Sequence, residues 1–159
     1  MNRLIGLLVL LPACHACGQN SNPIFITANG LAVMSDGGTP KTTAEELDEA
    51  IELIENAYPG AISIAKDATL TIVPTVFECA GGEVCAGVYY PGVHEMFIMR
   101  DPEYGATICR TAFIHEYFHH ILTMFDKDVP GDAHADPAIW SKDGLVNTVL
   151  LQCYEHFEN

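Results

Sequence analysis

The residues best suited to chemistry lie together in the segment His115-Glu116-Tyr117-Phe118-His119. Histidines four positions apart on a helix stand one turn above each other on the same face, so their imidazoles can bind one metal ion. Zinc suits this pair because it accepts neutral imidazole nitrogen in a tetrahedral shell, and a catalytic site keeps one position for water. Glu116 is expected to project toward that water and accept its proton. The spacing therefore predicts that His115 and His119 bind one Zn²⁺ ion and that Glu116 is the general base of a hydrolase.

This segment resembles the active-site helix of the zincin metallopeptidases, in which His-Glu-x-x-His lies beneath an antiparallel edge strand. The resemblance extends from Thr69 to Trp140 and is specific only at the motif. It implies a zincin-like α+β fold, with a small, mostly antiparallel sheet packed on the helix. It also implies hydrolysis of peptide bonds in a peptide or protein substrate that binds along the edge strand. A hairpin expected over residues 87–99 would supply that strand.

A third protein ligand is needed to complete the zinc shell. In the metzincin branch a Gly and a third His follow the motif at fixed spacing, but Leu122 and Phe125 occupy those positions, which excludes that branch. In the gluzincin branch a Glu from a later helix is the third ligand. We expect His134 in this role, because a turn before it is long enough to return the chain to the helix and imidazole is a preferred zinc ligand. The alternatives are Asp132, Asp136 and Glu155.

A different function on the same fold also fits the sequence. The protein would then bind zinc without catalysis, for storage or for partner binding, or act as a scaffold without metal. Glu116 argues against pure zinc binding, since a storage site does not need this carboxylate. We therefore expect an active zinc metallopeptidase.

Four segments with helical patterning surround or contain the motif. They are residues 42–58, 106–124, 137–140 and 145–157. Thr42 and Glu45 have the spacing of a capping box at the start of the first helix. Asp136 followed by a proline is a favourable start for the third helix.

Strand patterning occurs in four segments. They are residues 24–35, 69–77, 87–90 and 93–99. Asn29-Gly30 interrupts the first segment and indicates a strand or hairpin, while Pro91-Gly92 indicates a hairpin between the last two. Pro74 interrupts the second segment, which predicts a sheet edge or a bulge there. Together with the helices, these segments predict an α+β domain.

The N-terminus has the features of an export signal. Residues 1–17 contain Arg3, an apolar run over residues 4–11 and small residues before a break, as in a secretory signal peptide. The run is shorter than the roughly 20 apolar residues that a membrane-spanning helix needs. The segment also resembles a bacterial lipoprotein signal, with Cys14 or Cys17 as the lipidated residue. We therefore expect a protein exported to the periplasm, cell surface or medium, and two alternatives stay open for its N-terminus: an ordinary cleaved signal, or membrane anchoring through one of these cysteines.

The remaining cysteines are expected to pair in an oxidising compartment. Two disulfides are predicted, Cys79–Cys85 across a short Gly-rich loop and Cys109–Cys153 between the motif helix and the last helix.

Composition indicates one globular domain. Of 159 residues, 49% are hydrophobic and 18% are charged, which is typical of a folded protein of this size. We assign residues 18–40 to a tether and first strand, and residues 41–159 to the zincin-like domain. The net charge of -14 argues against nucleic acid as a partner, because binding phosphates requires a basic surface.

Overall fold

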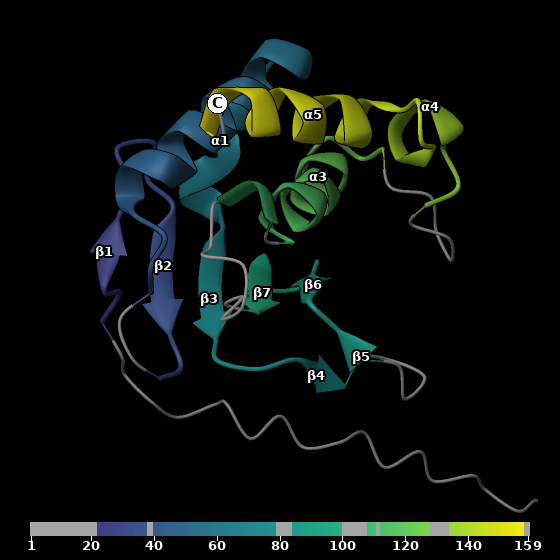
Figure 1. The fold of residues 1–159 in the computed structure, drawn as a ribbon. Helices are drawn as coiled ribbons and strands as arrows, with labels where there is room; N and C mark the ends of the chain where they lie inside the picture. The colour runs from purple at the N-terminus through teal and green to yellow at the C-terminus, as the bar shows by residue number, and fades with distance from the viewer. Residues whose placement is uncertain are drawn as a thin grey trace, which may run out of the picture.

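The computed structural model describes residues 22–37, 40–78, 84–99, 108–110, 112–127 and 134–157 (Figure 1). These residues form an α+β fold, as predicted from the sequence patterns. The strands are β1 (Phe25–Ile26), β2 (Ala32–Ser35), β3 (Thr69–Val73), β4 (Phe77–Glu78), β5 (Val84–Cys85), β6 (Gly87–Tyr90) and β7 (Glu95–Met99). The helices are α1 (Ala44–Ala57), α2 (Ala61–Ile64), α3 (Phe113–Met124), α4 (Pro137–Trp140) and α5 (Leu145–Phe157), with short 3-10 helices at Ala65–Asp67 and Ile108–Arg110.

Five strands form one mixed sheet in the order β1-β2-β3-β7-β6, while β4 pairs with β5 separately. The pairs β1–β2 and β6–β7 are antiparallel, whereas β2–β3 and β3–β7 are parallel. The prediction of a mostly antiparallel sheet is therefore wrong. One reason is that α1 and α2 connect β2 to β3 and return the chain to the same end of the sheet, which makes these two strands parallel.

The two predicted hairpins are confirmed, but the position of β3 differs from the prediction. The first hairpin turns at Asn29-Gly30. The second turns between β6 and β7, in a segment that begins with Pro91-Gly92. β3 lies inside the sheet, although Pro74 predicts an edge or a bulge. The strand ends at Val73, directly before the proline, so the missing N–H of Pro74 removes no hydrogen bond from the sheet.

α1 begins with a capping box that lies one residue later than predicted. The Thr43 hydroxyl accepts a hydrogen bond from the Glu46 N–H (3.1 Å), and the Glu46 carboxylate accepts one from the Thr43 N–H (2.8 Å). Thr42 and Glu45 have the same spacing, but Thr42 is buried. The exposed threonine therefore caps the helix.

The helices pack on one another and on the sheet around a single core. α3 contacts β6 and β7, and α5 lies against α1, α3 and α4 (Figure 1). The core takes fully buried side chains from strands and helices alike, among them Val33, Leu70, Met96, Leu47, Ile51 and Phe118. α3 is thus held between the sheet and α5, and nine of its residues are buried.

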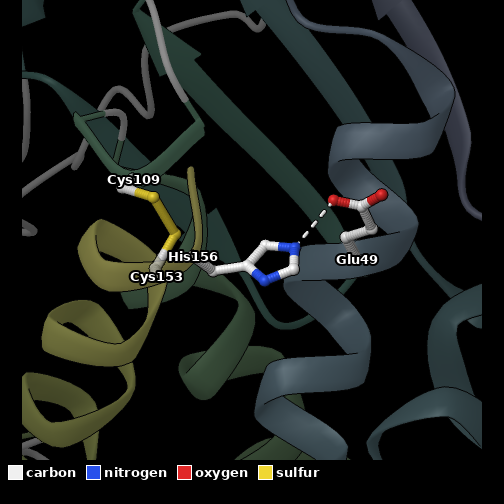
Figure 2. Close-up of a disulfide and its surroundings, with 4 residues drawn as sticks. All are labelled: Glu49, Cys109, Cys153 and His156. Atoms are coloured by element: carbon white, nitrogen blue, oxygen red, sulfur yellow. Dashed lines mark hydrogen bonds and ion pairs between the residues drawn. A yellow bond between two sulfur atoms is a disulfide. The ribbon is translucent and has the colours of Figure 1, made fainter. Parts of the chain in front are cut away.

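A disulfide joins the C-terminal helix to the segment before α3, as predicted. Cys109 and Cys153 are bonded, with their Cα atoms 5.6 Å apart (Figure 2). Beside it, His156 Nε2 of α5 lies 3.0 Å from a Glu49 carboxylate oxygen of α1. Cys85 is also disulfide-bonded, and its predicted partner, Cys79, lies outside the described residues.

The predicted signal segment lies outside the described residues, together with Cys14 and Cys17. None of the described helices combines the length and the apolar character needed to span a bilayer.

Candidate metal centre

The candidate metal centre is built on α3, where the motif histidines share one face. His115 and His119 stand one helical turn apart, and their Nε2 atoms are 3.2 Å from each other. Their ring centroids are 5.0 Å apart. The helical spacing alone accounts for this arrangement, because residues i and i+4 lie on the same side of a helix.

His134 joins the pair from the segment before α4, although it lies 15 positions after His119 in the sequence. Its Nε2 atom is 3.1 Å from His115 Nε2. Within the described residues, the group of side chains that could hold an ion consists of His115, His119 and His134, with ligand atoms within 4.8 Å of one another. The structure thus brings the predicted third ligand to the first two.

The alternative third ligands are not part of this group. Asp136 caps α4, because its carboxylate accepts a hydrogen bond from the Ala138 N–H (2.9 Å). Glu155 is an exposed residue of α5, and Asp132 lies outside the described residues. Asp136 therefore has a structural role that does not involve the imidazoles.

The spacing of the three nitrogens fits a tetrahedral ion. Zinc–nitrogen bonds of about 2.0–2.1 Å in a tetrahedral shell place two ligand nitrogens about 3.3–3.4 Å apart. The observed Nε2–Nε2 distances of 3.2 Å and 3.1 Å are close to this value. Three imidazoles would occupy three positions of such a shell, and the fourth would remain open for water or substrate.

Burial keeps two of the imidazoles neutral. Desolvation, together with a smaller electrostatic effect of His134, lowers the pKa of His115 to about 4. Desolvation also lowers the pKa of His119 to about 3, with smaller contributions from His115 and His134. Because metals bind imidazole nitrogen only when it is deprotonated, both side chains are in the binding form at neutral pH.

Glu116 lies buried against the edge strand of the sheet. It is 5% exposed, and burial raises its pKa to about 7. A Cβ atom placed on Gly87 of β6 would lie 2.7 Å from Glu116 Oε1, so strand and carboxylate are in direct contact. Among the described residues, none forms a hydrogen bond with this carboxylate. A carboxylate in this position can accept a proton from a water molecule within hydrogen-bonding distance.

His120 is buried and hydrogen-bonded, in a chain of contacts that the sequence did not reveal. Its Nε2 lies 3.1 Å from the Ile64 carbonyl oxygen and must donate to it, so its Nδ1 accepts from the Tyr89 hydroxyl (3.1 Å). Tyr89 Oη in turn accepts from His94 Nδ1 (2.9 Å). Tyr89 belongs to β6 and His120 to α3, so this chain ties the edge strand to the motif helix.

Trp140 is a second residue that the motif did not reveal. Its ring lies 4.9 Å from His115, 4.4 Å from His119 and 4.6 Å from His134, measured between centroids. The only sequence signal is its place near His134, at the end of the helix that Asp136 caps. Spacing rules for metal ligands do not include an aromatic residue of this kind.

A cavity of about 470 Å³ lies beside two of the imidazoles. His115, His134 and Trp140 line it on one side, and Val146 and Leu150 of α5 are among its other lining residues. Ser141, Lys142 and Asn147 also line it, so a molecule bound at the three imidazoles could extend into a space of mixed polar and apolar character.

No family model, curated protein or solved structure matches this chain. The chemistry of the centre is therefore inferred from its own geometry.

Proposed function

We propose that this protein binds one Zn²⁺ ion through His115, His119 and His134 and hydrolyses peptide bonds, with Glu116 as general base. One observation carries the proposal. Three imidazole Nε2 atoms meet at distances suited to a tetrahedral ion, and the residue after the first of them is a buried glutamate. The likeness of this segment to the zincin metallopeptidases supports the same assignment.

The donor set favours zinc over other common ions. Calcium and magnesium prefer six or more oxygen ligands, whereas the group offers three imidazole nitrogens. Zinc accepts such nitrogens at catalytic sites that hold three protein ligands and one exchangeable position.

The chain's own residues account for the proton transfer. A zinc ion supplies Lewis acidity, which polarises a substrate carbonyl and lowers the pKa of a water molecule to about 7. The Glu116 carboxylate accepts the proton of the attacking water and later donates it to the leaving amine. Its burial beside Gly87 holds it in one place and excludes bulk water.

The elements around the centre suit an extended peptide. Among the described residues β6 is the last strand of the main sheet, so one side of its backbone could pair with a substrate strand. The cavity beside His115 and His134 offers room for a substrate side chain, and its wall includes Pro137, Val146 and Leu150.

Metal analysis tests the ligand set. We expect purified protein to bind one Zn²⁺ ion per chain, and His134→Ala to lose it, because two imidazoles are too few for a stable site. Asp136→Asn is the matched control, since this side chain caps α4 and should not affect zinc content. Full zinc retention in His134→Ala would show that another residue completes the shell.

Cleavage of a peptide library tests the catalytic assignment. We expect Glu116→Gln to keep its zinc but to lower kcat/KM by about a hundredfold to ten-thousandfold, as removal of a general base does. Glu155→Gln serves as the control, because this exposed glutamate lies on α5. A wild-type protein that binds zinc yet cleaves no peptide would instead support a zinc-binding protein without catalysis.

A further inference from the structure

The chain contains a single tryptophan, and its ring packs against all three imidazoles of the candidate metal centre. Its centroid lies 4.4–4.9 Å from those of the three histidines. The histidine centroids are themselves 4.8–5.1 Å apart. The four ring centres therefore occupy the corners of a nearly regular tetrahedron.

This arrangement places the indole over the triangle of imidazoles, not beside one of them. Its plane is nearly parallel to His119, at 28°, and crosses His134 at 79°. Since carbon atoms in contact are separated by about 3.5–4.0 Å, no water or ion fits between the indole and the imidazoles. The indole therefore covers one face of the cluster of three imidazole rings.

The protein holds Trp140 firmly in this position. The backbone N–H of Trp140 donates a hydrogen bond to the Asp136 carbonyl oxygen (3.0 Å), and this bond closes the turn of α4. The neighbouring Ile139 is buried. A Cβ atom on Gly144 would lie 2.6 Å from the Ile139 carbonyl oxygen, so the turn after α4 is tightly packed. The indole is thus fixed by its helix as well as by its contacts with the imidazoles.

We propose that Trp140 is a positioning residue of the metal centre, whose indole closes one face of the three-imidazole cluster and holds the rings in the orientation that binds an ion. This inference rests on the metal binding proposed above. Residues that orient metal ligands from outside the shell typically change metal affinity by tenfold to a hundredfold when they are replaced.

Intrinsic fluorescence tests the location of Trp140, because the emission of the chain's single tryptophan comes from this ring alone. Metal-free protein is titrated with Co²⁺, and binding is followed in parallel by calorimetry and by the visible absorption of the bound ion. We expect the emission to fall and to reach its plateau at one Co²⁺ per chain, and added Zn²⁺ to reverse the loss. Co²⁺ binding without a change in emission overturns the role of Trp140 but leaves the metal centre standing. Absence of Co²⁺ binding overturns both.

Three variants test the positioning role. We expect Trp140→Ala to weaken Zn²⁺ binding by about tenfold, measured by competition with a chromogenic chelator, and to change the Co²⁺ absorption spectrum. Trp140→Phe keeps a ring over the imidazoles and should recover most of the affinity. Phe157→Leu is the control, because this half-buried aromatic residue of α5 packs on the core and on His156. Equal affinity and an unchanged spectrum in folded Trp140→Ala, checked by circular dichroism, would overturn the proposal.

Discussion

His115 and His119 bind protons more weakly than histidines in water do, and Glu116 binds its proton more tightly. Burial is the main cause in all three cases, since it disfavours the charged form of each group. Near neutral pH the two imidazoles are therefore uncharged in the metal-free protein, and Glu116 lies close to its midpoint of protonation. These are the states that a metal ligand and a general base require.

These pKa values predict how the stability of the metal-free protein depends on pH. The two histidines have an ordinary pKa of 6.5, which falls to about 4 and about 3 in the fold. Below pH 6.5 the unfolded chain therefore binds more protons at these sites, and acid favours unfolding. Glu116, raised from 4.5 to about 7, has the opposite effect between these two values. We expect the contribution of these three groups to the free energy of unfolding to fall as the pH drops from 6.5 to 4.5, and to fall most steeply between about pH 4.5 and 4. Below about pH 3, where both histidines are protonated in the fold as well, it should level off.

Urea denaturation of chelator-treated protein measures this dependence. A variant with both His115→Gln and His119→Gln lacks the two buried imidazoles, which together contribute about 3 kcal/mol per pH unit between pH 6.5 and 4.5. Only the opposite effect of Glu116 then remains, so this variant should become more stable as the pH falls through this range. Identical pH profiles for wild type and variant would contradict the prediction.

At the scale of elements, the close approach of β6 to α3 shapes the site. Gly87 of β6 touches Ala112, the residue before α3, and the Glu116 side chain. On the same strand, Tyr89 links to His120 through its hydroxyl. The strand therefore contacts the motif helix at two positions, one at the Glu116 carboxylate and one at His120.

Gly87→Ala tests the first of these contacts. The new Cβ would lie 2.9 Å from Glu116 Cγ and closer still to the Ala112 Cβ, so β6 or α3 must move. We expect a loss of about 1–3 kcal/mol in the free energy of unfolding, as for other overpacked sites, and a lower kcat/KM.

Gly92→Ala is the matched control, because a Cβ there would meet nothing within 4 Å. Equal urea midpoints for the two variants would show that β6 can shift from α3 without cost.

At the scale of the whole molecule, one covalent loop encloses the candidate centre. The Cys109–Cys153 disulfide spans 44 positions, and the three imidazoles, Glu116 and Trp140 all lie between the two cysteines. α5, which carries Cys153, also reaches α1 through the contact of His156 with Glu49 (Figure 2). The disulfide therefore restrains the segments that must meet at the site.

Removal of this disulfide should destabilise the protein strongly. In the chain-entropy model, a loop of this length contributes roughly 4 kcal/mol, because the cross-link restricts the unfolded chain. We expect the double variant Cys109→Ala/Cys153→Ala to unfold at a lower urea concentration and a lower temperature than wild type.

A reducing agent provides the control for this comparison. It should lower the midpoint of wild type more than that of the double variant, because the disulfide of Cys85 is present in both proteins. Equal shifts would contradict a stabilising role for the Cys109–Cys153 bond.

Local patterns predicted four of the described helices, all except α2, and the first two members of the candidate centre. α5 spans the predicted residues 145–157, and Asp136 caps α4 as expected. His115 and His119 share a face because helix geometry alone sets the i,i+4 relation. The predicted start of the motif helix near residue 106 was too early, since α3 begins at Phe113.

Short-range signals in the sequence were thus enough to predict most of the elements and to place His115, His119 and Glu116 on one helix. They gave no indication that β3 runs parallel to both of its neighbours or that Trp140 packs against the imidazoles, and the approach of His134 to the motif helix could be proposed but not fixed without the fold. The reason is physical. A helix period or a turn depends on neighbouring residues, whereas strand partners and ring contacts between distant segments depend on how the whole chain packs around its core.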